Sequence, residues 1–469
     1  MLQMLRNEIF FWSAWIIIPL IFEIIPSIGN FFILFFKKNK FNIDSNRKRK
    51  RKNKNKEKEK EILSYWPDIT IIVPIYNSSE TLEACIDSIA NSNYNTSLIN
   101  VLFIDNGSKD NSFAVFEKCQ LKYTNLAMHW TTSKQGKSRA LNKAIFNSTG
   151  KYVINIDSDG ILHKDALKNL ITKFEKNPNI HCQTGVILTR PTLIEKTKNI
   201  FLKIFRKLEF MEYCQAFLAG RNFESETNGI FTLSGAFSAF RKSTLFSTWL
   251  YNTETICEDA HLTFQVKTNL KEKVHLCENA IFMVDPIDNY GKFYAQRQRW
   301  QIGQLEVVHM FMQEHMKHPI KAIIKDNNMR ILLQDHTFAF PRLIWYFALA
   351  ALAILNYSIG TVLKATLITY LLYVFISFLY YLNIISFLKD FKDIKIYYKK
   401  HILLLLLLPI YNLNAFFVRL AGIINCIVRP STWKTLTPKE EKQAAINVVK
   451  KDFFFISKIQ EKIRYVLET

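Results

Sequence analysis

Two short apolar runs in the sequence end in acidic side chains. Val101–Ile104 is followed by Asp105, and Tyr152–Ile156 is followed by Asp157 and Asp159. Open parallel sheets bind ligands beyond the carboxyl ends of their strands. A single aspartate at such a place usually forms an Asx turn or a helix cap. Two such clusters together favour a site for a metal-bound diphosphate, because Mg²⁺ takes one or two carboxylates plus phosphate oxygens and waters.

The segments around these clusters alternate between strand and helix patterns. Ile69–Tyr76 is a continuous apolar run, as expected of a strand that is buried on both faces. A helix pattern follows it, with Leu82, Ile86 and Ile89 on one side, and Ser138–Asn147 reads as another helix. This β-α-β alternation predicts an α/β fold with a mostly parallel sheet and helices on both of its faces.

Seven short segments give the middle of the chain a family resemblance. In sequence order they are Ile72–Asn77, Asp105–Ser108, Gly136–Asn142, Asp157–Asp159, Ser234–Phe237, Cys257–Asp259 and Gln296–Trp300. Over about residues 68–300 the chain thereby resembles the processive, membrane-embedded glycosyltransferases of family 2, which include cellulose, hyaluronan and poly-N-acetylglucosamine synthases. The membrane layout has a looser similarity to glycosyltransferases of exosortase-associated gene sets in Gram-positive bacteria. The family usually has Thr in place of Cys257, a departure that leaves the acidic pair intact.

The resemblance implies a GT-A-type, Rossmann-like domain with a site for a UDP-sugar. Asp105 would accept hydrogen bonds from the uracil or ribose, and Lys137 would place a charge on the phosphates. A solvated lysine at a helix start is the alternative for Lys137. Asp157 and Asp159 would hold the cofactor, Mg²⁺ or Mn²⁺, on the diphosphate. The full set of donor-binding residues expected is Pro74, Tyr76, Asn77, Asp105, Lys137 and Asp157.

The same resemblance implies that Asp259 is the catalytic residue, a general base that deprotonates the acceptor hydroxyl as it attacks the anomeric carbon. One displacement with one base predicts inversion of configuration. Glu258 would have a supporting, orienting role, and a salt bridge is the alternative for it. Gly235 lies in the segment that resembles the acceptor-site loop.

The segment Gln296–Trp300 reads Q-R-Q-R-W, and the resemblance implies acceptor and diphosphate contacts there from Gln296, Arg297, Arg299 and Trp300. Three of them, Gln296, Arg299 and Trp300, have the i, i+3, i+4 spacing that puts side chains on one helical face. Arg299 suits the diphosphate because its planar fork pairs with two oxygens. Trp300 offers a flat surface for a sugar, and an anchor at the membrane interface is its alternative.

The charge distribution places the chain at a membrane. The 62 Lys and Arg against 40 Asp and Glu give +22, and Arg47–Lys60 alone holds ten of these cations with two Glu. That run follows the apolar stretch Phe10–Phe36, which is long enough to cross a bilayer and too long for a signal peptide. It has no interleaved aromatic residues, so nucleic-acid binding is not expected. The seven scattered cysteines fit a reducing compartment.

Apolar segments return at Phe338–Tyr357, Thr366–Leu388 and Ile402–Val428. The basic bias predicts a multi-pass protein of the cell membrane with a cytoplasmic catalytic domain. Ile402–Val428 is either a crossing or a re-entrant or interfacial segment, because polar residues interrupt it. The domains expected are a membrane segment at 1–40, a basic low-complexity linker at 41–66, the catalytic domain at 67–308, an interfacial helical segment at 309–337, membrane helices at 338–428 and a basic tail at 429–469.

Together with these features, the resemblance implies transfer of N-acetylglucosamine or glucose from a UDP-sugar to a growing polysaccharide. The alternative is transfer of one sugar to a polyprenyl phosphate or another lipid-linked acceptor, which the Q-R-Q-R-W segment disfavours. A non-catalytic membrane scaffold is a third hypothesis, and the intact Asp157, Asp159 and Asp259 disfavour it. The expected partners are therefore the UDP-sugar donor, a polysaccharide or glycolipid acceptor and the cell membrane. An accessory membrane protein is left open.

Overall fold

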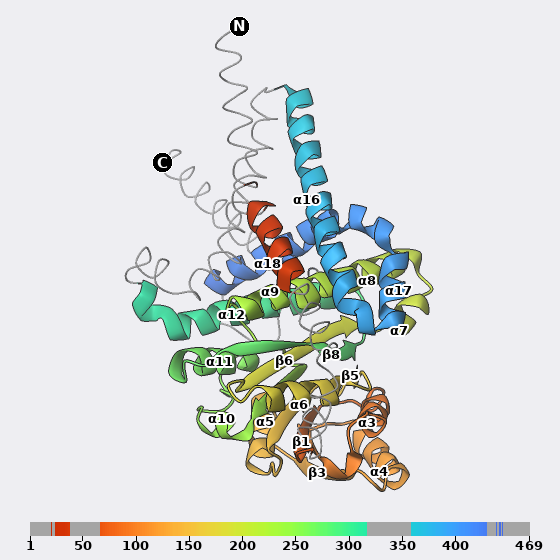
Figure 1. Cartoon of the computed structure of the whole chain (residues 1–469), viewed down its shortest axis with the longest axis vertical. Helices are drawn as coiled ribbons and strands as arrows, with labels where there is room; N and C mark the ends of the chain where they lie inside the picture. Colours follow the sequence, from red (N-terminus) through yellow and green to blue (C-terminus); the bar gives the residue numbers. More distant parts are fainter. Residues whose placement is uncertain are drawn as a thin grey trace, which may run out of the picture.

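The computed structural model describes residues 20, 24–37, 66–316, 358–428, 438, 440, 441 and 443. Figure 1 shows a sheet flanked by helices at one end of the molecule, a layer of helices beside it, and the long helix α16 extending from that layer. The expected apolar segment Phe338–Tyr357 lies outside the described residues, as do the basic run Arg47–Lys60 and most of the expected tail.

An eight-stranded sheet forms the centre of the domain, in the order β3-β2-β1-β4-β7-β6-β8-β5. The strands are β1 (Ile69–Ile75), β2 (Ile99–Asp105), β3 (Ala127–Thr132), β4 (Tyr152–Ile156), β5 (Gly160–Leu162), β6 (Cys182–Thr189), β7 (Phe237–Arg241) and β8 (Val274–Val284). The first four in space are parallel to one another and β6 is parallel to β8, whereas β4–β7, β6–β7 and β5–β8 are antiparallel. The sheet is therefore mixed and mostly parallel, as the sequence predicts.

The parallel block brings the predicted acidic clusters to one edge. Ile75 at the end of β1 pairs with Asp105 at the end of β2, and Asp157 follows β4, the neighbour of β1 on its other side. All seven residues of β1 are buried. The helices α3 (Leu82–Ala90), α4 (Ser112–Lys122), α5 (Lys137–Phe146) and α6 (Ala166–Lys176) follow in the chain. In α3 the buried side includes Leu82, Ile86 and Ile89, as expected.

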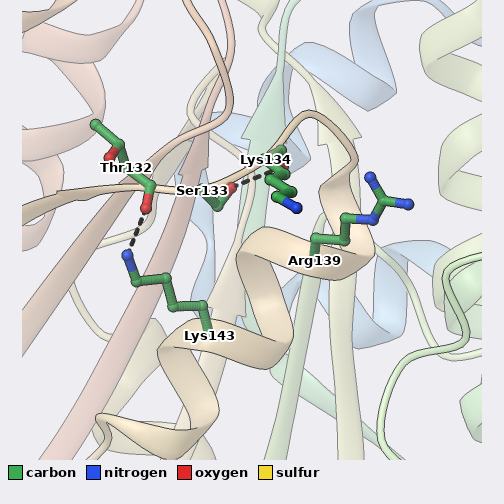
Figure 2. Close-up of a pocket in the computed structure, with 5 residues that line it drawn as sticks. All are labelled: Thr132, Ser133, Lys134, Arg139 and Lys143. Atoms are coloured by element: carbon green, nitrogen blue, oxygen red, sulfur yellow. Dashed lines mark hydrogen bonds between the residues drawn. The ribbon is translucent and has the colours of Figure 1, made fainter.

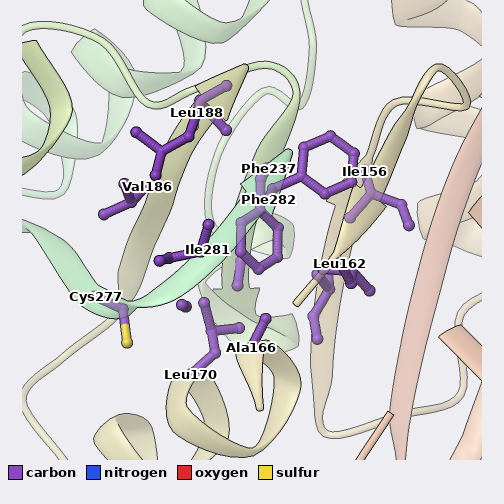
Figure 3. Packing of buried hydrophobic residues seen from close by; sticks show 14 of the residues in the cluster. Ile156, Leu162, Ala166, Leu170, Val186, Leu188, Phe237, Cys277, Ile281 and Phe282 are labelled. Carbon is purple, nitrogen blue, oxygen red and sulfur yellow. The ribbon is translucent and has the colours of Figure 1, made fainter. Parts of the chain in front are cut away.

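Two phenylalanine rings fill the space over two glycines where the parallel and antiparallel parts of the sheet meet. A Cβ atom at Gly185 would lie 2.1 Å from the ring of Phe237, and one at Gly160 would lie 2.3 Å from the ring of Phe282. Figure 3 shows both rings within a group of aliphatic side chains from β4, β6, β8 and α6. Because interiors pack at near-crystalline density, the fit of Phe237 over Gly185 fixes the position of β7 beside β6.

A second group of helices follows β6 in the chain. It comprises α7 (Pro191–Glu195), α8 (Ile200–Tyr213), the π-helix η3 (Cys214–Gly220), α9 (Arg221–Glu226), α10 (Lys242–Phe246), α11 (Glu258–Phe264), the π-helix η4 (Gln265–Asn269) and α12 (Tyr290–Met316). The helix α12 continues through residue 308, where the sequence predicts a domain boundary. The Q-R-Q-R-W segment and the start of the expected interfacial segment therefore belong to one helix.

The C-terminal part consists of α16 (Ile359–Phe387), the short η6 (Leu388–Asp390), α17 (Lys392–Lys400), η7 (Ile402–Leu406) and α18 (Leu408–Val428). Within the described ranges one helix, Val362–Asp390, is long and apolar enough to cross a membrane, and Ile25–Lys37 is a shorter apolar helix. Figure 1 shows α18 lying within the layer that contains α8 and α12, with α16 leaving that layer. The predicted segment Ile402–Val428 is thus split, and its main helix packs on α12.

Candidate active site

A cavity of about 1180 Å³ opens at the edge of the sheet where β1, β2 and β4 end. Its walls bring together seven of the residues singled out from the sequence, namely Pro74, Tyr76, Asn77, Lys137, Asp157, Asp159 and Arg299. Pro74 lies near the end of β1, Tyr76 and Asn77 follow that strand, the two aspartates follow β4, and Arg299 comes from α12. Residues more than 200 positions apart in the chain therefore share one cavity, whose volume suits a nucleotide-sized ligand.

Two turns at the ends of β1 and β2 hold each other in place. Asn77 has a φ of +49°, its N–H donates to Ser108 Oγ (3.0 Å), and its Oδ1 accepts from Lys109 N–H (2.8 Å). Asp105 Oδ1 accepts from Ser108 N–H (3.0 Å). Asp105 thus has the turn-forming contact that sequence reasoning gives as its alternative, and it is absent from the described lining of the cavity. Its neighbour Asn106 lines the cavity instead.

Lys137, the first residue of α5, links the two acidic parts of the site. Its Nζ lies 2.5 Å from Asp157 Oδ1 and 3.7 Å from Glu258 Oε1, and it donates to the carbonyl oxygen of Gly235 (3.4 Å). Burial alone would lower the pKa of Lys137, but the carboxylates of Asp157 and Glu258 raise it well above its usual value. Lys137 is therefore a cation held between the end of β4 and the start of α11, and the solvated alternative does not describe it.

Three carboxyl groups near Lys137, those of Asp159, Glu258 and Asp259, have pKa values above their ordinary range. Burial raises the pKa of Asp159, and the neighbouring charge of Asp157 raises it further. Burial also raises the pKa of Asp259 and brings that of Glu258 to about 7, while the charge of Lys137 opposes both shifts. Buried like charges of this kind mark functional sites more often than structural ones. The cluster has an excess of negative charge that a bound cation would relieve.

The loop before β7 holds Asp259 beside the cavity. Asp259 Oδ2 accepts from the Gly235 N–H (3.0 Å), and its Oδ1 accepts from the Ala260 N–H (2.8 Å). The Gly235 carbonyl in turn accepts from Asn155 Nδ2 (2.8 Å) on β4. Thr263 Oγ1 on α11 donates to the Asp259 carbonyl (2.6 Å) and accepts from Leu233 N–H (2.8 Å). The acceptor-loop segment and the acidic pair are therefore locked together by hydrogen bonds.

Gly235 has no room for a side chain, because a Cβ atom there would lie 2.9 Å from Asp259 Oδ2. We expect Gly235→Ala to displace the Asp259 carboxylate and to weaken its hydrogen bond to the loop. Displacement of a reacting group by less than an ångström lowers turnover by about 10- to 100-fold. Turnover and nucleotide affinity of the purified variant should be measured together. Gly220→Ala is a suitable control, since the nearest atom to its Cβ would be at 3.6 Å. Normal turnover by Gly235→Ala would contradict the assignment.

The helix α12 contacts the three residues that precede the acidic pair Glu258 and Asp259. Glu306 Oε2 accepts from Thr255 Oγ1 and from Ile256 N–H, both at 3.1 Å. One turn earlier, a Cβ atom at Gly303 would lie 2.3 Å from Cys257 Sγ. Cys257, which departs from the family pattern, therefore packs against bare helix backbone. These contacts fix where Arg299 and Trp300 stand relative to Asp259.

The residues of the Q-R-Q-R-W segment have two environments. Gln296, Arg299 and Trp300 are half-buried, whereas Arg297 and Gln298 are buried. Arg299 lines the cavity. Arg297 is absent from the described lining and forms an ion pair with Glu212 on α8, at 2.5 Å between Nη2 and Oε2. The structure thus gives Arg297 a protein partner in place of the expected diphosphate contact.

Several residues of the site escape sequence reasoning. Asn106, Asp110, Arg139 and Ser158 all line the cavity. Asn106 Oδ1 accepts from the N–H of Gly136 (2.6 Å), whose φ is +132°. Arg139 follows Lys137 in the same helix turn, and its place within the Gly136–Asn142 segment is the signal that would have identified it. Asp110 gives no such signal, because its position depends on the loop's fold.

A second hollow adjoins the cavity and shares Arg139 with it. Its volume is about 580 Å³, and Figure 2 shows its lining residues Thr132, Ser133, Lys134, Arg139 and Lys143. Lys143 Nζ donates to the carbonyl of Thr132 (2.5 Å). Three cationic side chains, those of Lys134, Arg139 and Lys143, therefore lie next to the cavity that contains Asp157 and Asp159. Such a field raises the local concentration of an anionic ligand.

A mixed sheet of this order, with carboxylates at the ends of its parallel strands, defines a GT-A-like α/β domain. Residues 70–246 match the family model of glycosyl transferase family 2. This region of the chain is therefore similar to glycosyltransferase family 2, as the segments within it indicate.

The relatives found by comparison share this domain. The poly-beta-1,6-N-acetyl-D-glucosamine synthase of Staphylococcus epidermidis is 28% identical over 244 residues, which are 51% of this chain and 55% of that protein. The Staphylococcus aureus protein of the same name is 26% identical over the same length. The chain thus matches about half the length of these curated relatives. A mannosyltransferase from Pyrobaculum calidifontis, solved with GDP-Man and Mn2+, has a TM-score of 0.55 at 16% identity, covering 88% of this chain and 98% of that one.

Proposed function

We propose that the protein is an inverting glycosyltransferase that moves N-acetylglucosamine, or else glucose, from a UDP-sugar to a growing polysaccharide at the cell membrane. The observation that carries this proposal is the position of Lys137. Its ammonium group lies between Asp157, at the donor cavity, and Glu258, beside Asp259. A donor diphosphate and an acceptor hydroxyl bound on these two sides would meet over one half-buried cation.

The residues at the end of β4 fit a divalent cation. Asp157 and Asp159 both line the cavity, and each has a carboxylate that Mg²⁺ or Mn²⁺ accepts as a ligand. Among the described residues no three His, Cys, Asp or Glu side chains gather as a complete metal site, so diphosphate and water oxygens would supply the remaining ligands. The bound ion would stabilise negative charge on the leaving nucleotide. Arg299, which reaches the same cavity, would pair with the diphosphate through its planar fork.

The acceptor would approach from the side of Asp259. In this proposal Asp259 accepts the proton of the attacking hydroxyl, and the backbone N–H of Gly235 keeps its carboxylate oriented (3.0 Å). Glu258 is 6% exposed and lies near Lys137, so we assign it the role of holding that lysine. The half-buried ring of Trp300 would support an acceptor sugar. Asp105 would act by shaping the turn at the nucleobase end of the cavity.

The choice of donor and product draws on the curated relatives, whose name states a poly-N-acetyl-D-glucosamine product. Transfer of one sugar to a lipid-linked acceptor remains the second candidate, and the apolar helix Val362–Asp390 is compatible with both. The two candidate reactions differ in the size of their products. Membranes that contain the protein should convert radiolabelled UDP-N-acetylglucosamine into a polymer that stays at the origin of a chromatogram. A single labelled glycolipid would favour the second candidate, and no labelled product from any UDP-sugar would refute both.

Loss of the bridging cation should change the pH dependence of the reaction. The charge of Lys137 lowers the pKa of Asp259 and of Glu258, so Lys137→Met should raise both. A base works only when deprotonated, so activity is lost as the pH falls through its pKa. The acid limb of the pH–rate profile should therefore move to higher pH, and on that limb the rate at a fixed pH should fall by about tenfold. Lys134→Met is the matched control. An unmoved acid limb would contradict the proposed contact between Lys137 and the base.

A further inference from the structure

Arg297 of the Q-R-Q-R-W segment is buried and is absent from the described lining of the donor cavity. It is 3% exposed, and its Nη2 lies 2.5 Å from Glu212 Oε2 on α8. A buried arginine is costly unless its charge is paired, so this carboxylate is required for its position. Arg297 consequently lies on the buried side of α12, which faces α8.

The same carboxylate binds a third helix. Tyr411, near the start of α18, donates its hydroxyl to Glu212 Oε2 (3.1 Å). Its ring also contacts Phe205 on α8 and Phe293 on α12, with ring centroids 5.3 and 5.8 Å apart. Three helices, α8, α12 and α18, therefore converge on Glu212. The helix α18 is joined to the segment that carries the site, although more than 100 positions separate Tyr411 from Arg297 in the chain.

The guanidinium of Arg297 also stacks on the tryptophan of the segment. Its central carbon lies 4.6 Å from the ring centroid of Trp300 and 5.2 Å from that of Phe293. A planar guanidinium stacks on an aromatic face while its edge keeps a hydrogen bond, and an ammonium group does not reproduce both contacts. Trp300 is thereby supported by a charge that α8 and α18 hold in place.

We propose that Arg297 is a positioning residue that fixes the ring of Trp300, and that α18 belongs to the acceptor site through Tyr411 and Glu212. The proposal rests on the function proposed above, in which Trp300 meets the acceptor sugar. Arg299, two positions away, lines the donor cavity directly. Loss of the Arg297 stack should therefore impair acceptor use and spare the donor side.

Kinetics of the detergent-solubilised full chain test this separation. Arg297→Lys keeps the charge and loses the stack, and it should raise the KM for a short N-acetylglucosamine oligosaccharide about tenfold. UDP affinity by calorimetry, and UDP release without acceptor, should stay within about twofold. Tyr411→Phe removes one hydroxyl and should change the acceptor KM in the same direction by about two- to threefold. This milder variant keeps the test valid if Arg297→Lys does not fold.

The control is Arg241→Lys, which also loses a guanidinium stacked on aromatic rings, those of Tyr152 and Phe174, at the far end of β4 from Asp157. It should leave the acceptor KM unchanged. Equal losses in UDP affinity and acceptor use in Arg297→Lys would overturn the proposal, because they would place Arg297 at the diphosphate. Unchanged acceptor KM in both Arg297→Lys and Tyr411→Phe would also overturn it.

A spectroscopic measurement separates this proposal from the proposed function. The emission of Trp300 is obtained as the difference between the wild type and Trp300→Phe, in the presence and absence of Arg297→Lys. A shifted emission maximum and greater quenching by acrylamide are expected when the stack is lost. This result would support the positioning role even if no sugar nucleotide is turned over, an outcome that would refute the proposed function alone. An unchanged Trp300 emission would overturn the positioning role whatever the activity.

Discussion

Asp259→Asn should reduce kcat by about 10²-fold or more and leave UDP binding nearly unchanged. The substitution keeps the shape of the side chain and its acceptor atom for the Gly235 N–H, which donates to Asp259 Oδ2 in the wild type (3.0 Å). It removes the basicity that the proposed chemical step requires of Asp259. Because this carboxylate is absent from the described lining of the donor cavity, nucleotide affinity should not depend on it.

Two comparisons make this result specific. Glu258→Gln should lower activity less than Asp259→Asn, since we assign Glu258 to Lys137, 3.7 Å away, and not to the acceptor. Asp165→Asn, a substitution of the same kind at the start of α6, should have no effect on kcat. The required measurements are UDP release under saturating donor and UDP affinity by calorimetry. If Glu258→Gln is the more damaging variant, the base is Glu258 and the role given to its neighbour is wrong.

Removal of divalent cations should abolish sugar transfer, and Mg²⁺ or Mn²⁺ should restore it. The physical reason is the crowded negative charge at the end of β4, where burial and the charge of Asp157 both raise the pKa of Asp159. A sugar nucleotide would bring further negative charge into this cavity. Asp159→Asn should therefore lose most activity, by about 10²-fold or more, because it removes one of two protein ligands.

The control for this prediction uses another carboxylate that lines the cavity, that of Asp110. Its oxygens accept from Ser79 N–H (2.8 Å) and from Ser112 Oγ (2.6 Å). These bonds lower the pKa of Asp110 to about 2, and Asp110→Asn should retain metal-dependent turnover. Activity should be titrated against free Mg²⁺ after EDTA treatment. Full turnover in EDTA would refute the metal role of Asp157 and Asp159.

Much of the catalytic domain follows from local patterns in the sequence. The unbroken apolar run at Ile69–Ile75 predicts a strand buried on both faces, and β1 is central and fully buried. The acidic residues at the ends of the strands β2 and β4 are predicted to lie at one edge of the sheet. The parallel pairing of β1 with both strands confirms this. The antiparallel strand β7 is harder to predict, because its place between β4 and β6 depends on the fit of Phe237 over Gly185.

Some features of the site can likewise be predicted from local motifs, whereas others depend on contacts between segments that are distant in the sequence. Motifs identify which residues gather, and the cavity contains Lys137, Asp157 and Arg299 as predicted. They do not reveal which side of α12 each arginine faces. Arg297 faces α8 because Glu212 and Tyr411 supply its partners, and both lie far from it in the sequence. Likewise the split of Ile402–Val428 depends on packing of α18 against α12, which periodicity within the segment does not encode.

We propose that one site binds the sugar nucleotide with its metal ion and also holds the base that activates the acceptor. Release of UDP from UDP-N-acetylglucosamine by the purified full chain tests it most directly, with an oligosaccharide acceptor added or withheld and GDP-mannose as a competing donor. We predict slow UDP release without acceptor and faster release with it. Asp159→Asn should abolish both reactions, and Asp259→Asn should abolish only the stimulation by acceptor. Release that is insensitive to acceptor and equal in the wild type and both variants would contradict the account.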